Sequence, residues 1–116
     1  GHAMAICTQK FQEPAEAILK GLKIFDCFSG FSYGDTLDVM KPNENMVYSA
    51  VKFLEPGRLI YVGDSEVDSK TAENSKAKFF LFLGGYRNSP VSSLKVHQAF
   101  DNFSKLPELI SSELAI

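Results

Sequence analysis

Apolar and polar positions along the chain follow two different periods, which predict short strands alternating with amphipathic helices. Short apolar runs bounded by turn residues are typical of buried strands. The expected strands are a segment ending at Thr8, residues 59–62, residues 79–83 and a last short one at 98–100. Apolar residues three and four positions apart predict helices after Pro14 and Asn43, and a last one around Pro107. The polar opening Ser65-Glu66-Val67-Asp68 predicts a further helix. Residues 24–31 are expected to form a short strand or an extended connection. This alternation predicts a three-layer, Rossmann-like α/β fold with a parallel sheet.

The composition is that of one ordinary globular domain. The chain has 116 residues, of which 45% are hydrophobic and 22% charged, with a net charge of −2; this length can bury a core. No basic face is visible, so we expect no nucleic acid as a partner. The run Phe79–Leu83 shows no alternation, which indicates a strand buried on both faces, and it is too short to cross a membrane. We therefore expect no membrane partner and a cytoplasmic location.

The first residues and the two cysteines add little chemistry. Gly1–Met4 looks like a cloning remnant, so the domain is taken as residues 5–116. Cys7 and Cys27 lie in apolar surroundings without the spacing of a metal site, and we expect buried thiols rather than a disulfide.

The segment Gly63–Asp68 is the strongest candidate for function. Asp64 follows a predicted strand, and Asp68 lies in the first turn of the predicted helix. Ligands of open α/β sheets bind at this edge, and Mg²⁺ typically takes one or two carboxylates together with water and phosphate oxygens. The pattern Ser65-x-x-Asp68 also matches a helix capping box. Acidic residues in the first turn of a helix also complement the helix dipole. From the motif alone, metal binding and helix capping are both open.

Three segments in order carry a resemblance to a known family. Thr8, then Lys41-Pro42, then Gly63–Asp68 resemble three of the four motifs of the haloacid dehalogenase superfamily, and most closely those of its phosphoglycolate phosphatase-like branch. The similarity extends from about Ile6 to Ile110. The resemblance implies a Mg²⁺-dependent hydrolase of small phosphate monoesters with this parallel fold.

The resemblance also implies a role for each matching residue. Thr8 would donate a hydrogen bond to an oxygen of the transferring phosphoryl group, and Lys41 would neutralise the charge shared by nucleophile and phosphate. Asp64 would hold Mg²⁺ directly, and Asp68 would hold it directly or through water. These roles suit phosphoryl transfer, which depends on positioning and charge neutralisation.

The chain departs from the family at the first motif. That motif is an Asp-x-Asp at the end of a strand before Thr8; it supplies the nucleophile and the general acid/base, and this sequence does not contain it. We therefore interpret the chain as the C-terminal part of a phosphatase core and predict that it is inactive alone. The residues between Thr8 and Lys41 already form a predicted helix and strand, whereas a cap domain would need about 50 residues or more.

The missing motif also removes a strand. In the family's sheet this strand lies between the strands that end at Thr8 and at Asp64, so both would expose unpaired backbone. We expect a homodimer or a strand swap to cover the gap. The alternative function is a non-catalytic α/β binding or assembly module. A receiver domain does not fit, because its lysine follows its acidic residues. His97 receives no role, and Tyr86 and Arg87 are interpreted as loop anchors.

Overall fold

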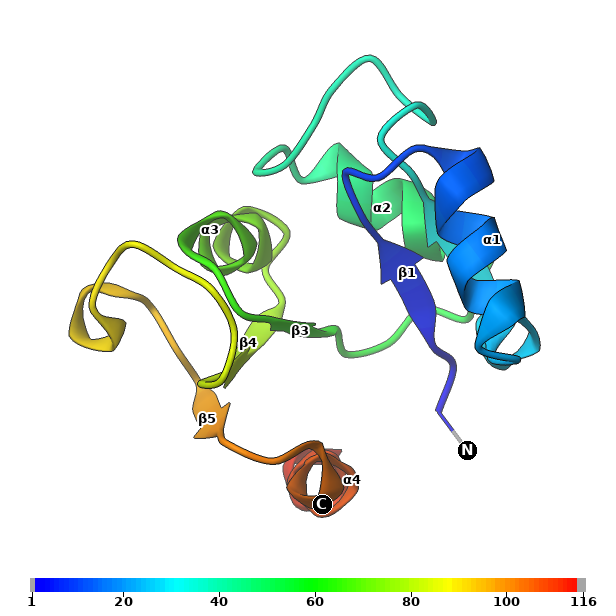
Figure 1. The fold of residues 1–116 in the computed structure, drawn as a ribbon. Coiled ribbons are helices and arrows are strands. Elements are labelled where there is room, and N and C mark those ends of the chain that lie inside the picture. The colour runs from blue at the N-terminus through cyan, green and yellow to red at the C-terminus, as the bar shows by residue number, and fades with distance from the viewer. Residues whose placement is uncertain (1, 115–116) are drawn as a thin grey trace. The chain divides into compact units, whose positions relative to one another are not determined.

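The computed structural model describes residues 2–114 and divides between Arg58 and Leu59 into two compact units, which are coloured blue to green and green to red in Figure 1. Each unit has its own parallel sheet. In the first, β1 (Ala5–Cys7) pairs with β2 (Gly30–Ser32). In the second, the strand order is β3 (Ile60–Gly63), β4 (Lys78–Phe82) and β5 (Gln98–Phe100). Among the described residues, no helix is long and apolar enough to cross a membrane.

In the first unit, α1 (Gln12–Gly21) connects the two strands and α2 (Asn45–Val51) follows β2. Pro14 lies in the first turn of α1, where its missing N–H group costs no helical hydrogen bond. The start of α1 is capped from a distant loop, because the Gln12 N–H donates to Asp35 Oδ1 at 2.9 Å. Short 3₁₀ turns and loops make the remaining connections.

The two faces of β2 contact different helices. Ser32 Oγ lies 3.7 Å from Met46 Sδ on α2, and a Cβ atom at Gly30 would meet the Ala50 carbonyl oxygen at 1.9 Å. The next residue after β2, Tyr33, points to the other side and donates a hydrogen bond of 2.9 Å from its hydroxyl to Glu16 on α1. Since successive residues of a strand face opposite sides, the first unit has a helix, a sheet and a helix as its three layers.

The second unit is organised around β4, which pairs with β3 on one side and β5 on the other. Phe79, Phe80 and Leu81 are each at most 3% exposed, which confirms the prediction of a strand buried on both faces. Helix α3 (Glu66–Asn74) packs against β3 and β4. Helix α4 (Leu106–Leu114) is tied to the sheet through Glu113, which accepts hydrogen bonds from Lys78 and His97.

The element order and parallel pairing confirm the predicted fold class, but several details were wrong. Residues 24–31, expected to form a short strand or an extended connection, contain a 3₁₀ turn at Phe25–Cys27, and the short strand β2 begins only at Gly30. Helix α2 ends at Val51 although the apolar spacing continues to Leu54. Cys7 and Cys27 are thiols as expected, but neither is buried, since Cys7 is half-buried and Cys27 is exposed.

The strands do not form one continuous sheet. Within the described residues β1 pairs with β2 and β3 with β4, and the two sheets are separate. Each sheet therefore ends on a strand that can accept a further partner.

Candidate functional site

The strand–helix junction of the second unit contains both candidate metal ligands. Asp64 directly follows β3 and is half-buried, and Ser65 is the N-cap of α3 with extended backbone. Ser65 Oγ accepts a hydrogen bond of 3.2 Å from the Asp68 N–H, as expected for a capping serine. The capping interpretation of Ser65 is thus confirmed.

The carboxylate of Asp68 lies inside this junction. Asp68 is only 9% exposed. Oδ2 accepts a hydrogen bond of 3.1 Å from the Asp64 N–H, and Oδ1 accepts one of 3.2 Å from the Tyr61 hydroxyl. In a capping box this carboxylate would return to the N–H of the capping residue, Ser65. Here it returns one residue earlier, to the residue that carries the other candidate carboxylate.

The loop that follows β4 lies against Asp64. The Tyr86 N–H donates to Asp64 Oδ2 at 3.4 Å, and Gly85 is in closer contact, because a Cβ atom there would lie 2.2 Å from Asp64 Oδ2. The same loop is joined to the start of α3, where the Asn88 N–H donates to both carboxylate oxygens of Glu66 at 3.3 and 3.1 Å. The backbone of the loop therefore positions the acidic residues at this end of the sheet.

Arg87 holds the loop from the other side. Its guanidinium donates to the carbonyl oxygens of Phe82 at 3.5 Å and Leu83 at 3.2 Å. The Tyr86 side chain is 77% exposed, and its hydroxyl donates to Asn88 Oδ1 at 3.2 Å. Both residues serve the loop, which agrees with their interpretation as loop anchors.

The other two predicted site residues belong to the first unit. Thr8 directly follows β1; its N–H donates to the Ser32 carbonyl at 2.9 Å, and its Oγ1 accepts from the Lys10 N–H at 3.1 Å. Lys41 is half-buried in the connection from β2 to α2, and its peptide bond to Pro42 is cis. Thr8 thus lies at the carboxyl end of a parallel strand, the edge at which such sheets bind ligands, whereas Lys41 lies in the connection nine residues after the end of β2.

The donor set at the strand–helix junction suits Mg²⁺ in type but is small. Carboxylate oxygens are hard donors of the kind that Mg²⁺ prefers, and Asp64 supplies one such group at the strand end. Asp68 directs its oxygens to Tyr61 and to the Asp64 backbone. No group of three or more His, Cys, Asp or Glu side chains that could hold a metal ion occurs in residues 2–114. Asp64 can therefore be one ligand, and further ligands have to come from elsewhere.

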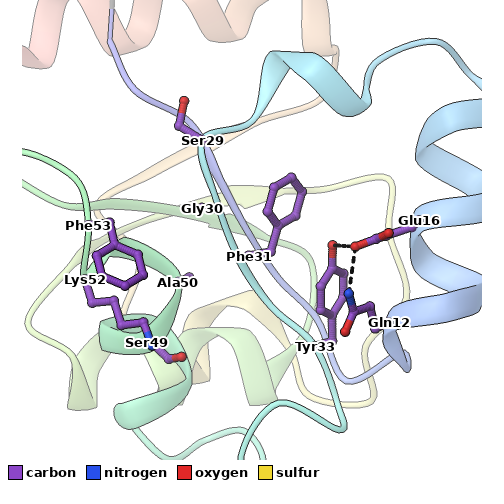
Figure 2. Close-up of a pocket in the computed structure, with 10 residues that line it drawn as sticks. All are labelled: Gln12, Glu16, Ser29, Gly30, Phe31, Tyr33, Ser49, Ala50, Lys52 and Phe53. Carbon is purple, nitrogen blue, oxygen red and sulfur yellow. Dashed lines mark hydrogen bonds between the residues drawn. The ribbon is translucent and has the colours of Figure 1, made fainter.

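A pocket of about 300 Å³ lies within the first unit, between α1, β2 and α2. Figure 2 shows the Tyr33 hydroxyl and the Gln12 side chain directed at Glu16, at 2.9 and 3.0 Å. The hydrogen bonds from Tyr33 and Gln12 lower the pKa of Glu16. Burial and the neighbouring Glu16 raise the pKa of Tyr33 far above its usual value. These polar groups satisfy one another, so the pocket shows no group prepared for a ligand.

Three contacts at the strand–helix junction escaped the sequence reasoning. They involve the Tyr61 hydroxyl, the Gly85 backbone and the Glu66 carboxylate. Tyr61 carried a usable signal, because a tyrosine inside a buried strand needs a hydrogen-bond partner for its hydroxyl. The other two depend on the path of a loop and left no pattern in the sequence.

Comparison with known proteins gives consistent results. The family model described as haloacid dehalogenase-like hydrolase matches residues 1–82. Phosphoglycolate phosphatases of Cereibacter sphaeroides and Rhodobacter capsulatus are 38% and 37% identical to the chain, over 99% and 95% of its length. These matches cover 53% and 50% of the two relatives, so the chain spans about half the length of the curated relatives it matches.

Solved structures show the same fold. A crystal structure titled a predicted phosphoglycolate phosphatase, from Haemophilus somnus, has a TM-score of 0.73 at 28% identity and covers 82% of this chain and 44% of its own. A hydrolase of the same superfamily from Ehrlichia chaffeensis reaches 0.77 at 20% identity, over 97% of this chain and 51% of its own. With the strand-end position of Asp64 and the family match over residues 1–82, the chain belongs to the haloacid dehalogenase-like hydrolase family.

Proposed function

We propose that this chain is the C-terminal core portion of a Mg²⁺-dependent phosphatase that acts on small phosphate monoesters such as phosphoglycolate. The observation that carries the proposal is the position of Asp64. Its carboxylate follows the edge strand β3, and the backbone of Gly85 and Tyr86 holds it from the side. The similarity to phosphoglycolate phosphatases supports the substrate class.

In this proposal the residues of the chain bind and orient the phosphate. Mg²⁺, when bound, supplies positive charge beside the phosphoryl oxygens, and Asp64 is its ligand from this chain. Thr8 donates a hydrogen bond to a phosphoryl oxygen from the end of β1. Lys41 brings a positive charge that opposes the negative charge of the carboxylate nucleophile and the phosphate. Together these groups supply positioning and charge neutralisation, on which phosphoryl transfer depends.

The proposal includes inactivity of the 116-residue chain by itself. A phosphatase of this family needs an Asp-x-Asp nucleophile, and the sequence holds none ahead of Thr8. The segment that carries it would also add the strand between β1 and β3, each of which ends a sheet in the described residues. In its absence we propose a homodimer or a strand swap that covers these edges. Thiols at Cys7 and Cys27 support a cytoplasmic location.

The test is hydrolysis of p-nitrophenyl phosphate with and without Mg²⁺, by the chain alone and by a longer protein that restores an upstream Asp-x-Asp segment. We expect activity only in the longer protein, and a loss of roughly 100-fold or more in its Asp64→Asn variant. Asp101→Asn is the matched control, because Asp101 is an exposed acid of the same unit that pairs with Lys105 at 2.8 Å.

A non-catalytic binding or assembly module is the second candidate. It is favoured by the absence of three convergent metal-binding side chains in residues 2–114. If the longer protein remains inactive, or if Asp64→Asn leaves its activity unchanged, the phosphatase proposal fails and the module is preferred. Activity of the 116-residue chain alone would contradict the proposed dependence on the missing segment.

A further inference from the structure

The Asp68 carboxylate joins two parts of the strand–helix junction. Oδ1 receives the Tyr61 hydroxyl from inside β3, and Oδ2 receives the N–H of Asp64 just beyond the end of that strand. Asp68 and Tyr61 are each 9% exposed, so the hydrogen bond between them is shielded from water, while the one from the Asp64 N–H is part-buried. A buried carboxylate with two donors is strongly oriented, because losing either donor leaves charge unsatisfied.

Its surroundings leave the carboxylate little freedom. A Cβ atom at Gly63 would lie 2.5 Å from Asp68 Oδ2, so the backbone of β3 lies directly against it. The Asp68 N–H is itself held by Ser65 Oγ at 3.2 Å. On the strand, the Tyr61 ring contacts the Phe79 ring with centroids 6.3 Å apart, which limits movement of the hydroxyl. The contact between Asp68 and the Asp64 backbone is therefore set by packing on both sides.

We propose that Tyr61 and Asp68 form a positioning pair that fixes the direction of the Asp64 carboxylate, so that Asp68 acts through Asp64 and is not itself a metal ligand. Holding the Asp64 N–H fixes the backbone from which its side chain leaves, while Gly85 bounds the carboxylate from the loop. Groups behind a metal ligand act in this way, and their loss typically weakens metal binding about 10- to 100-fold. The inference rests on the proposed function only in treating Asp64 as a ligand.

The first test needs no metal. Hydrogen exchange of the Asp64 amide is measured by NMR in the 116-residue chain, relative to the Leu81 amide, which reports the stability of β4. We expect exchange about fivefold faster in Tyr61→Phe and about tenfold or more in Asp68→Asn, the latter because a hydrogen bond to a charged acceptor is lost. Adding Tyr61→Phe to Asp68→Asn should have almost no further effect, since both act through one contact.

Matched controls separate this contact from a general loss of hydroxyl or charge. Tyr86→Phe removes a tyrosine hydroxyl from the same unit, and Asp101→Asn removes an exposed acid; both should leave relative exchange at Asp64 within about twofold of the wild type. The proposal is overturned if Tyr61→Phe also leaves the relative exchange rate of the Asp64 amide unchanged. It is also overturned if the effects of Tyr61→Phe and Asp68→Asn on that rate are additive in the double variant. Because the Asp64 exchange rate is divided by that of Leu81, a general loss of stability in a variant does not alter the comparison.

The second test uses Mn²⁺ alone as a probe in the longer protein that restores the upstream Asp-x-Asp segment, followed through broadening of the Asp64 and Tyr86 amide signals. We expect Asp64→Asn to abolish the broadening, and Tyr61→Phe and Asp68→Asn to raise the dissociation constant by a similar factor of about ten. If Asp68→Asn abolishes binding while Tyr61→Phe has no effect, Asp68 is a ligand and the positioning role is wrong. If Asp64→Asn changes nothing, or the wild type binds no Mn²⁺, the metal assignment of the proposed function fails; the exchange experiment then decides the positioning pair.

Discussion

Gly85 and Asp64 lie in backbone-to-side-chain contact: a Cβ atom at Gly85 would lie 2.2 Å from both Cβ and Oδ2 of Asp64. No glycine of the described residues has a positive φ angle, so conformation does not require glycine at this position. The requirement is space. The loop after β4 can approach the proposed metal ligand this closely only because residue 85 has no side chain.

Replacing Gly85 by alanine should therefore disturb Asp64 directly. We expect Gly85→Ala to lower the free energy of unfolding of the second unit by about 1–3 kcal/mol, the usual cost of overpacking, and to shift the amide signals of Asp64 and Tyr86. Urea unfolding and NMR measure the two effects. Gly57→Ala, in the first unit at a position where nothing lies within 4 Å of a Cβ, controls for the effect of an added methyl group by itself. Unchanged Asp64 and Tyr86 signals in Gly85→Ala would contradict the close contact.

A second pair of glycines predicts effects of opposite sign in the first unit. A Cβ atom at Gly30 would lie 1.9 Å from the Ala50 carbonyl oxygen, so Gly30→Ala should push α2 from β2 and cost about 1–3 kcal/mol. Gly21 is the last residue of α1 and has nothing within 4 Å, so Gly21→Ala should be neutral or stabilise by up to about 1 kcal/mol. Urea unfolding measures the free energy of unfolding of both variants. Equal effects of Gly30→Ala and Gly21→Ala would contradict the close contact of Gly30 with α2.

The cap of α3 has a predictable stability effect. Ser65→Ala removes the acceptor for the Asp68 N–H, and we expect a loss of about 1 kcal/mol in the free energy of unfolding. Thermal unfolding measures it. Ser112→Ala changes an exposed serine within α4 and should be neutral or slightly stabilising because alanine favours helix. If Ser65→Ala is as well tolerated as Ser112→Ala, the Ser65 hydroxyl does not cap α3.

The attachment of α4 should weaken in acid. Hydrogen bonds from Lys78 and His97 hold the pKa of Glu113 below its usual value of 4.5. A carboxyl group whose pKa is lower in the folded state than in the unfolded state stabilises the fold at pH values above its unfolded-state pKa. This stabilisation is lost as the pH falls below about 4.5 and then through the lower pKa that Glu113 has in the folded state.

NMR signals of α4 followed from pH 7 to pH 3 measure this loss. Glu113→Gln should weaken the attachment already at pH 7 and flatten the change between pH 5 and pH 3. Glu108→Gln, at an exposed carboxylate of the same helix, should retain the wild-type pH profile. A Glu113→Gln variant with the full wild-type acid transition would show that another group controls it.

Local patterns were sufficient for most elements of the fold. The unbroken apolar run at 79–83 predicted a strand buried on both faces, and Phe79, Phe80 and Leu81 of β4 have this burial, whereas Leu83 lies beyond the strand and is exposed. Patterns failed where tertiary contacts define an element. The rings of Phe25, Phe31 and Tyr33 stack with centroids 5.1 and 5.7 Å apart, so the aromatic residues of 24–31 serve a ring stack around a 3₁₀ turn. Such a stack has no strand periodicity.

Local residue patterns were sufficient to place the candidate carboxylates. A β-rich apolar run that ends in Gly63-Asp64-Ser65 places Asp64 at a strand end and Ser65 at a helix cap, because both depend on neighbouring residues alone. The family also follows from motifs in the sequence. The contacts of the second carboxylate depend on the tertiary structure: Asp68 accepts hydrogen bonds from the Tyr61 hydroxyl and the Asp64 N–H.

Only the tertiary structure shows how Asp64 is held. Parallel pairing places Gly63 beside Leu81, and the loop beyond β4 then brings the Tyr86 N–H to a carboxylate 22 residues earlier. Contacts of this kind depend on backbone position and on the absence of a side chain at Gly85. Neither property leaves a periodic signal in the order of residues, which is why the structure was needed to reveal them.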